Sequence, residues 1–176
     1  MKVTKSKIDG VCVIEPDIYK DERGFFMESF QIKRYKELAG IDCNFVQDNF
    51  SRSSKNVLRG LHFQKKFPQG KLVRASKGEI LDVAVDIRKE SSTFGLWESF
   101  LLTEENRKQV WVPPGLAHGF LIVSDQADFE YKASEFYHPE DEFTLLWNDP
   151  HLGIEWSCEN PILSEKDKKG IFFKDI

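Results

Sequence analysis

The sequence has 176 residues, of which 40% are hydrophobic and 31% are charged, and its net charge at neutral pH is −4. A chain of this length can form one domain, residues 1–176, that buries roughly 70% of its unfolded surface without help from disulfides or a metal. The three cysteines show no CxxC spacing, which argues against a disulfide scaffold and a zinc finger. The sequence has no apolar run of membrane-spanning length and no signal-like N-terminus, so we expect a cytoplasmic protein rather than a membrane protein.

Short strand signals recur along the whole chain and are separated by turn residues. The sequence predicts strands at 11–15, 24–30, 45–51, 57–64, 71–76, 80–88, 97–102, 109–112, 119–123, 128–137 and 143–147. Within 80–88, four apolar residues alternate with Asp82, Ala84 and Asp86, which predicts a strand with one apolar and one polar face. Fifteen Phe, four Trp and four Tyr suit a sheet-rich core.

Helix signals are few. Residues 31–39 are expected to form one helix, closed by Gly40, and a second short helix is expected near Ser164, which can cap residues 165–167. Many strands with little helix predict an all-β sandwich or closed barrel rather than a βαβ fold. No glycine-rich phosphate loop is present, so side chains would have to hold any nucleotide.

The charge is unevenly distributed. Residues 49–78 contain no Asp or Glu but eight of the 25 Lys and Arg residues, which leaves 17 basic against 29 acidic residues elsewhere. This basic segment either forms a solvated face or binds a small anion such as a diphosphate. The acidic remainder would repel a long polyanion, so we do not expect nucleic acid as a partner.

Residues 113–118, PPGLAH, fit the PxGxxH pattern of cupin jelly rolls, in which a tight turn leads into a strand that points a histidine into the barrel mouth. A metal-binding cupin also needs an HxH pair and a carboxylate upstream. The corresponding segment here is His62-Phe63-Gln64, which supplies one histidine, whereas a catalytic metal normally takes three protein ligands. We therefore expect a cupin-like, double-stranded jelly-roll barrel with a few short helices and no metal.

Several longer segments, in this order along the chain, resemble the dTDP-4-dehydrorhamnose 3,5-epimerase family. They are DERGFF (21–26), FVQDN (45–49), VLRGLHFQ (57–64), GKLVR (70–74), DVAVDIR (82–88), WNDP (147–150) and LSEKD (163–167). The resemblance implies a cofactor-free isomerase in a pathway that makes dTDP-rhamnose for cell-surface polysaccharide. It also implies a homodimer in which an N-terminal strand crosses to the partner.

Epimerisation beside a ketone needs a base, a group that stabilises the enolate, and an acid on the opposite face. His62 suits the base because imidazole titrates near neutral pH, and Lys71 can stabilise the enolate oxygen. The resemblance assigns Asp167 to orient His62 and Tyr131 to deliver the second proton. Judged from the residues alone, Tyr131 could instead be a packing residue and Asp167 a first-turn helix residue.

The resemblance also implies a set of substrate contacts. His118 and Asp82 are expected to line the catalytic cavity, with Asp82 in a supporting role. Tyr137 is expected to stack on the pyrimidine, and Phe26 to form a second aromatic wall. The remaining substrate-binding candidates, some of them well suited to bind phosphate, are Arg23, Glu28, Gln47, Asp48, Asn49, Arg59, Lys71, Glu142 and Lys166. Of these, Arg23 and Glu28, together with Phe26, would serve the partner's site.

Three functional hypotheses follow. The first is an epimerase that inverts C3 and C5 of dTDP-4-dehydro-6-deoxy-D-glucose to give dTDP-4-dehydro-L-rhamnose. The second is an epimerase of a related 4-keto nucleotide sugar, or one that inverts a single carbon; Phe50, where many relatives have His, and Phe136, where many have Tyr, motivate it. The third is a non-catalytic sugar-binding jelly roll or a metal-dependent cupin.

Overall fold

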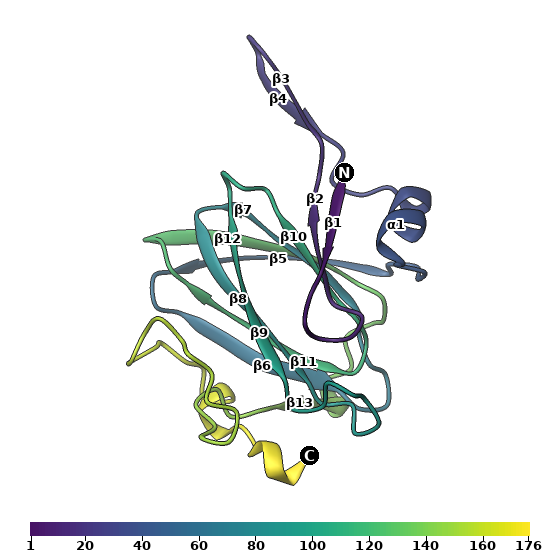
Figure 1. The fold of residues 1–176 in the computed structure, drawn as a ribbon. Helices are drawn as coiled ribbons and strands as arrows, with labels where there is room; N and C mark the ends of the chain where they lie inside the picture. Colours follow the sequence, from purple (N-terminus) through teal and green to yellow (C-terminus); the bar gives the residue numbers. More distant parts are fainter.

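The computed structural model describes all residues 1–176, and eleven of its thirteen strands form two antiparallel sheets that curve around a shared interior (Figure 1). The six-stranded sheet has the order β1 (Lys2–Lys5), β2 (Cys12–Glu15), β10 (Gln109–Val112), β7 (Lys71–Lys77), β12 (Gln126–Ala133) and β5 (Gln47–Ser54). The five-stranded sheet has the order β13 (Glu142–Thr144), β6 (Leu58–Gln64), β11 (Leu116–Ile122), β8 (Glu79–Asp86) and β9 (Trp97–Thr103). The predicted jelly-roll class is confirmed.

The interior between the sheets is filled by a cluster of 15 buried hydrophobic residues. Val73 and Phe129 reach into it from the six-stranded sheet, and Ile80 and Phe120 from the five-stranded sheet. Burying each large apolar side chain contributes about 1.5–3 kcal/mol, so this shared core holds the two sheets together. One end of the interior is left for polar side chains, and the candidate site lies there.

Strand β8 has the predicted polar and apolar faces, but its polar face is buried rather than exposed to solvent. Its polar face, with Asp82 and Asp86, turns into the barrel, and both aspartates are completely buried. Its apolar face turns outward, where Val83 and Val85 are covered by residues near the C-terminus, including Phe173. Both faces of β8 are therefore buried, and the alternation separates a polar interior from an outer apolar layer rather than core from solvent.

The single α-helix, α1 (Ile32–Ala39), agrees with the prediction: the Gln31 side chain caps its N-terminus, and Gly40 ends it in the left-handed conformation. Three 3₁₀ turns are η1 (Pro139–Asp141), η2 (Asp167–Lys169) and η3 (Phe173–Asp175). The helix expected near Ser164 is the short turn η2, and the Ser164 hydroxyl accepts the Asp167 backbone N–H at 3.1 Å. No helix is long and apolar enough to cross a membrane.

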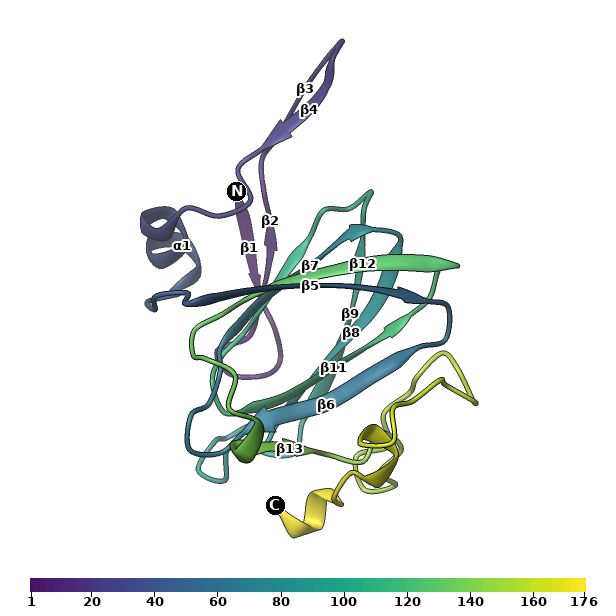
Figure 2. The ribbon, with the colours of Figure 1, turned by 180° about the vertical axis from the view of Figure 1, so that it is seen from behind.

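All eleven predicted strands are present, ten of them with shifted ends and 109–112 with the predicted ends, and two more strands were missed. Strand β1 (Lys2–Lys5) and strand β3 (Ile18–Asp21) are mostly exposed, so they carry no apolar alternation that could reveal them. Strand β3 pairs with β4 (Gly24–Met27) in a hairpin that projects far from the barrel (Figures 1 and 2). Large fractions of Tyr19 (62%), Phe25 (52%) and Phe26 (69%) on this hairpin are exposed.

Candidate active site

A cavity of about 260 Å³ opens between the two sheets and collects polar residues from five strands. Strand β6 supplies Arg59 and His62, β7 supplies Lys71, β11 supplies His118, and β12 supplies Tyr131. Strand β5 adds Asn49 to the wall. The structure thus brings three of the predicted reacting groups, His62, Lys71 and Tyr131, to one cavity, although they are widely separated along the chain.

His62 is held by a carboxylate that is distant in sequence. Its Nε2 lies 2.6 Å from Oδ1 of Asp167, whose side chain is only 4% exposed. Burial opposes ionisation of Asp167, but the hydrogen bonds and positive charge from His62, Ser164 and Lys166 together outweigh it and hold the pKa of Asp167 below its ordinary value. An ionised Asp167 accepts a hydrogen bond from Nε2–H, which leaves Nδ1 of a neutral His62 as the nitrogen that can take up a proton.

Lys71 places a positive charge across the cavity from His62. Burial lowers the pKa of Lys71 to about 8, while the negative charges of Glu142 and Asp82 oppose this shift. The ammonium nitrogen lies 5.8 Å from the centre of the Tyr131 ring. A cation held in a buried, pre-formed position is suited to stabilise an oxyanion that develops nearby.

Tyr131 stands on β12 opposite Asn49 of β5, and its ring packs against Phe129. Burial raises the pKa of the Tyr131 hydroxyl, and the negative charge of Glu142 raises it further, against the opposing effect of Arg59. The phenol therefore keeps its proton at neutral pH and can act as a proton donor.

Behind the cavity, Nε2 of His118 lies 2.8 Å from Oδ2 of Asp82, and both residues are buried. The second oxygen of Asp82, Oδ1, and the amide nitrogen Nδ2 of Asn49 are buried without a hydrogen-bond partner. Buried polar atoms are nearly always paired, so these two atoms indicate bonds that a bound molecule or water completes.

The cavity mouth carries the residues predicted to hold the nucleotide. The Tyr137 hydroxyl donates a hydrogen bond to Oε2 of Glu142 at 2.8 Å, and the Lys166 ammonium forms an ion pair with the same carboxylate. Gln47 donates to Asn49 at 2.9 Å and accepts the Tyr137 backbone N–H at 3.2 Å. A further hollow is lined by Tyr137, Glu142 and Lys166, so an aromatic face, a carboxylate and a cation meet there.

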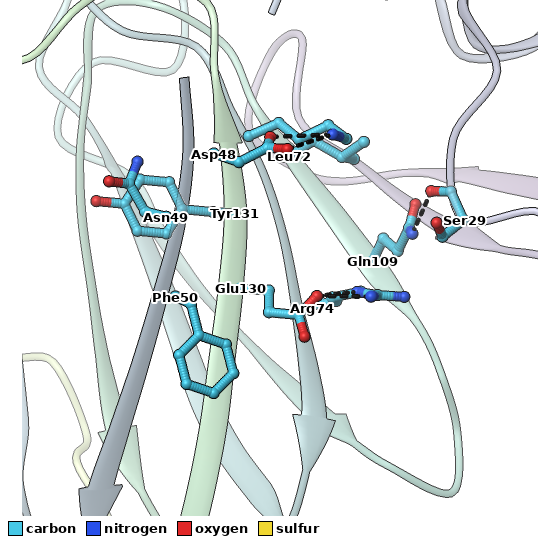
Figure 3. Close-up of a pocket in the computed structure, with 10 residues that line it drawn as sticks. Ser29, Asp48, Asn49, Phe50, Leu72, Arg74, Gln109, Glu130 and Tyr131 are labelled. Atoms are coloured by element: carbon cyan, nitrogen blue, oxygen red, sulfur yellow. Dashed lines mark hydrogen bonds and ion pairs between the residues drawn. The ribbon is translucent and has the colours of Figure 1, made fainter. Parts of the chain in front are cut away.

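Asp48 was predicted to contact the substrate, but its side chain points away from the cavity. Alternation along β5 turns Gln47 and Asn49 toward the cavity and Asp48 to the outer face, where it accepts a hydrogen bond from Lys132 at 2.9 Å. Figure 3 shows Tyr131 and Asn49 close together, apart from the Asp48 ion pair and the Arg74–Glu130 ion pair. The position of the Asp48 side chain does not support a substrate contact within this chain.

The hairpin residues also lie outside this chain's own cavity. Arg23 is exposed and pairs with Asp21, Phe26 is exposed, and Glu28 pairs with Arg34 at 2.7 Å. Figures 1 and 2 both show the hairpin extending away from the barrel. None of these three side chains lines the cavity of its own chain.

The basic segment 49–78 divides between two environments. Arg52 and Arg74 turn to the outer face and pair with Asp128 and Glu130, whereas Arg59 and Lys71 line the cavity. The sequence reasoning missed Ser53, whose hydroxyl accepts hydrogen bonds from the Arg59 guanidinium at 3.1 and 3.2 Å. Its signal was the alternation of β5, which places Ser53 on the same face as Gln47 and Asn49.

No group of three or more His, Cys, Asp or Glu side chains is arranged to hold a metal ion. The two cavity histidines are each engaged by a separate carboxylate, Asp167 and Asp82. We expect the purified protein to contain no stoichiometric metal by elemental analysis, and to keep its full activity after incubation with EDTA. Inactivation by EDTA that is reversed by one added metal would contradict this prediction.

The fold and the cavity define a cupin-like jelly roll whose barrel mouth holds a histidine, a lysine and a tyrosine. A profile of the dTDP-4-dehydrorhamnose 3,5-epimerase family matches residues 5–175, and the chain belongs to this family. The epimerase of Shigella flexneri is 52% identical over 176 residues, which cover 99% of this chain and 97% of that protein.

Solved structures agree with this assignment. The crystal structure of dTDP-6-deoxy-D-glucose-3,5-epimerase from Legionella pneumophila, in complex with dTDP-4-keto-L-rhamnose, is 53% identical with a TM-score of 0.95 and covers 98% of this chain and 93% of its own. A 3'-monoepimerase from Streptomyces bikiniensis, in complex with dTDP-quinovose, is 33% identical with a TM-score of 0.90; the match covers 96% and 86% of the two chains.

Proposed function

We propose that the protein is a cofactor-independent epimerase that inverts C3 and C5 of dTDP-4-dehydro-6-deoxy-D-glucose to give dTDP-4-dehydro-L-rhamnose. The observation that carries the proposal is the cavity in which the His62–Asp167 pair, Lys71 and Tyr131 meet. These four groups lie between residues 62 and 167 and act in one cavity, so we propose that residues 1–176 form a single domain. The cytoplasmic location stays a prediction.

The C4 ketone of this substrate acidifies the hydrogens on C3 and C5. Nδ1 of His62 takes one of these protons, and the electron pair of the broken C–H bond moves onto the ketone oxygen to form an enolate. Lys71 stabilises that oxyanion with its positive charge. Tyr131 then gives its hydroxyl proton to the carbon from the opposite face, which inverts the centre.

The nucleotide part of the substrate would bind at the mouth. The exposed ring of Tyr137 offers a stacking surface for the pyrimidine, and Arg59 and Lys166 offer positive charge to the diphosphate. Asn49 has a buried amide nitrogen ready to donate a hydrogen bond. Side chains in these positions replace the glycine-rich phosphate loop that the sequence lacks.

Incubation with dTDP-4-dehydro-6-deoxy-D-glucose in deuterated water tests the proposal. We expect NMR to show deuterium at both C3 and C5 of the product. Deuterium at one carbon would favour a single-carbon epimerase, the hypothesis motivated by Phe50 and Phe136. No deuterium at either carbon would remove this substrate.

Deprotonation of Lys71 should limit the activity at alkaline pH. Because burial lowers the pKa of Lys71 to about 8, the ammonium is charged below that pH and neutral above it. We expect kcat/KM to decline as the pH rises through about 8. In Lys71→Arg, whose guanidinium stays charged, the decline should move to higher pH even if the maximal rate falls. A pH–rate profile of both proteins checks this, and an identical alkaline limb would contradict it.

We infer further that the working form is a homodimer with exchanged N-terminal hairpins. The support is the projecting β3–β4 hairpin, which leaves three large aromatic side chains exposed on this chain. Exposed apolar groups that cluster on a projecting element are typical of a protein interface. Arg23, Phe26 and Glu28 would then complete the partner's active site.

A complementation experiment tests which site the hairpin serves. We expect Arg23→Ala and His62→Ala each to be weakly active alone. The refolded mixture should regain up to about a quarter of wild-type activity, because random pairing makes half of the dimers mixed and each mixed dimer has one intact site of two. The measurement is activity after the two variants are unfolded together and refolded. No recovery would mean that the hairpin serves its own chain.

A further inference from the structure

Glu142 faces the nitrogen of His62 that the Asp167 contact leaves free. Strand β13 pairs with β6 so that Thr144 lies opposite His62, and Glu142, two residues before Thr144, lies on the same face of the strand. Its Oε1 is 3.7 Å from Nδ1 of His62, on the other side of the ring from Asp167. The imidazole therefore lies between two carboxylates.

The second oxygen of Glu142 is tied to the cavity mouth. Oε2 accepts the Tyr137 hydroxyl and pairs with the Lys166 ammonium, and the Glu142 side chain is only 13% exposed. Burial opposes its ionisation, but the hydrogen bonds from Lys166 and Tyr137, together with the nearby positive charge, outweigh burial and hold the pKa of Glu142 below its ordinary value. Glu142 is therefore a fixed negative charge beside His62 at neutral pH.

Several other charged or titratable groups also face His62 and must be considered beside Glu142. Asp167 and Lys166 approach from the segment that contains η2, His118 from β11, and Arg59 from His62's own strand β6. Lys71 of β7 and Tyr131 of β12 lie across the cavity. Arg59 and Lys71 are the cations of this cavity wall, and Glu142 is the carboxylate on the Nδ1 side of His62.

We propose that Glu142 is a positioning residue for the base: its carboxylate stabilises the imidazolium that forms when Nδ1 of His62 takes the substrate proton. The inference rests on the proposed function for its catalytic meaning, but the interaction itself exists in the free protein. It differs from a substrate contact, because the carboxylate acts on His62 whether or not a nucleotide is bound. An opposite charge within about 4–6 Å of a titrating group favours its charged form.

The direct test is an NMR titration of the free protein, which contains only four histidines. The imidazole C–H signal of His62 is assigned by its loss in His62→Asn. In Glu142→Gln, which keeps the shape but removes the charge, the midpoint of the His62 titration should fall by about one pH unit. The matched control is Glu140→Gln, which removes an exposed carboxylate that pairs with His138, and it should leave the midpoint unchanged.

An unchanged midpoint in Glu142→Gln, or equal shifts in both variants, would overturn the proposal. Tyr137→Phe provides a second, charge-neutral test in case Glu142→Gln does not fold. Because it removes one proton donor from the Glu142 carboxylate, the carboxylate should act more strongly on His62, and the midpoint should rise. A constant midpoint in this variant also counts against the role of Glu142.

The kinetic counterpart separates positioning from substrate binding. In Glu142→Gln the acidic limb of the kcat/KM profile should move to lower pH, and kcat should fall as well. A residue that only binds substrate would raise KM and leave the limb in place. The NMR titration needs no substrate, so it can confirm the interaction of Glu142 with His62 even if the protein does not catalyse the proposed reaction. Failure of the Glu142 proposal is therefore distinguishable from failure of the proposed function.

Discussion

His62→Ala should slow the exchange of substrate protons with solvent by about 10²–10⁴-fold, because the variant lacks the base that removes the proton. The expected loss is large because the neighbouring groups cannot substitute for imidazole: Asp167 is buried behind it and Glu142 is engaged by Lys166 and Tyr137. Deuterium incorporation into dTDP-4-dehydro-6-deoxy-D-glucose, followed by NMR, gives the rate for each carbon.

His151→Ala is the matched control, since it removes an exposed histidine whose ring stacks on Phe173 away from the cavity. We expect it to exchange protons at the wild-type rate. A circular dichroism spectrum like that of the wild type would show that His62→Ala keeps its fold. Near wild-type exchange in His62→Ala would mean that another group is the base.

Tyr131→Phe should separate two steps that the wild-type enzyme joins. The variant keeps His62, Asp167 and Lys71, so it should still form the enolate and exchange protons with solvent. It lacks the hydroxyl that gives a proton to the opposite face, so most protons should return from the side of His62 with the original configuration. Net inversion should therefore fall much further than exchange.

The measurement is a comparison of deuterium content and product configuration in the same samples. If exchange and inversion fall by the same factor, Tyr131 positions the substrate and does not deliver the proton. If neither falls, Tyr131 is a packing residue, and Tyr137 is the next candidate for the acid. The Tyr137 hydroxyl already donates to Glu142, and this bond, with burial, raises the pKa of Tyr137 to about 12.

Local sequence patterns predicted most of the fold. Turn residues and apolar alternation located eleven strands, and Gly40 marked the end of α1, because these signals act over a few residues. Strands β1 and β3 were not predicted because almost none of their side chains are buried, so their sequences show no alternation of apolar and polar residues. The PxGxxH pattern placed His118 on a strand, and the segment around His62 marked the second histidine.

The assembly of the site depended on tertiary structure. Asp167 is 105 residues from His62, and only the packing of η2 against β6 brings its carboxylate to 2.6 Å from the imidazole. Spacing along the chain gave no reason to pair these residues, and only the family resemblance did. Likewise, Glu142 faces His62 because β13 pairs with β6 in one register and not another.

The sequence by itself therefore determined which segments are strands and which residue types carry proton chemistry. The tertiary structure decided which face of each strand enters the barrel. Alternation is symmetric between the two faces, so it marked the polar face of β8 without revealing that Asp82 and Asp86 would be buried. For the same reason it could not show that Asp48 turns outward while Gln47 and Asn49 turn in, since only the packing of one sheet against the other distinguishes the two directions.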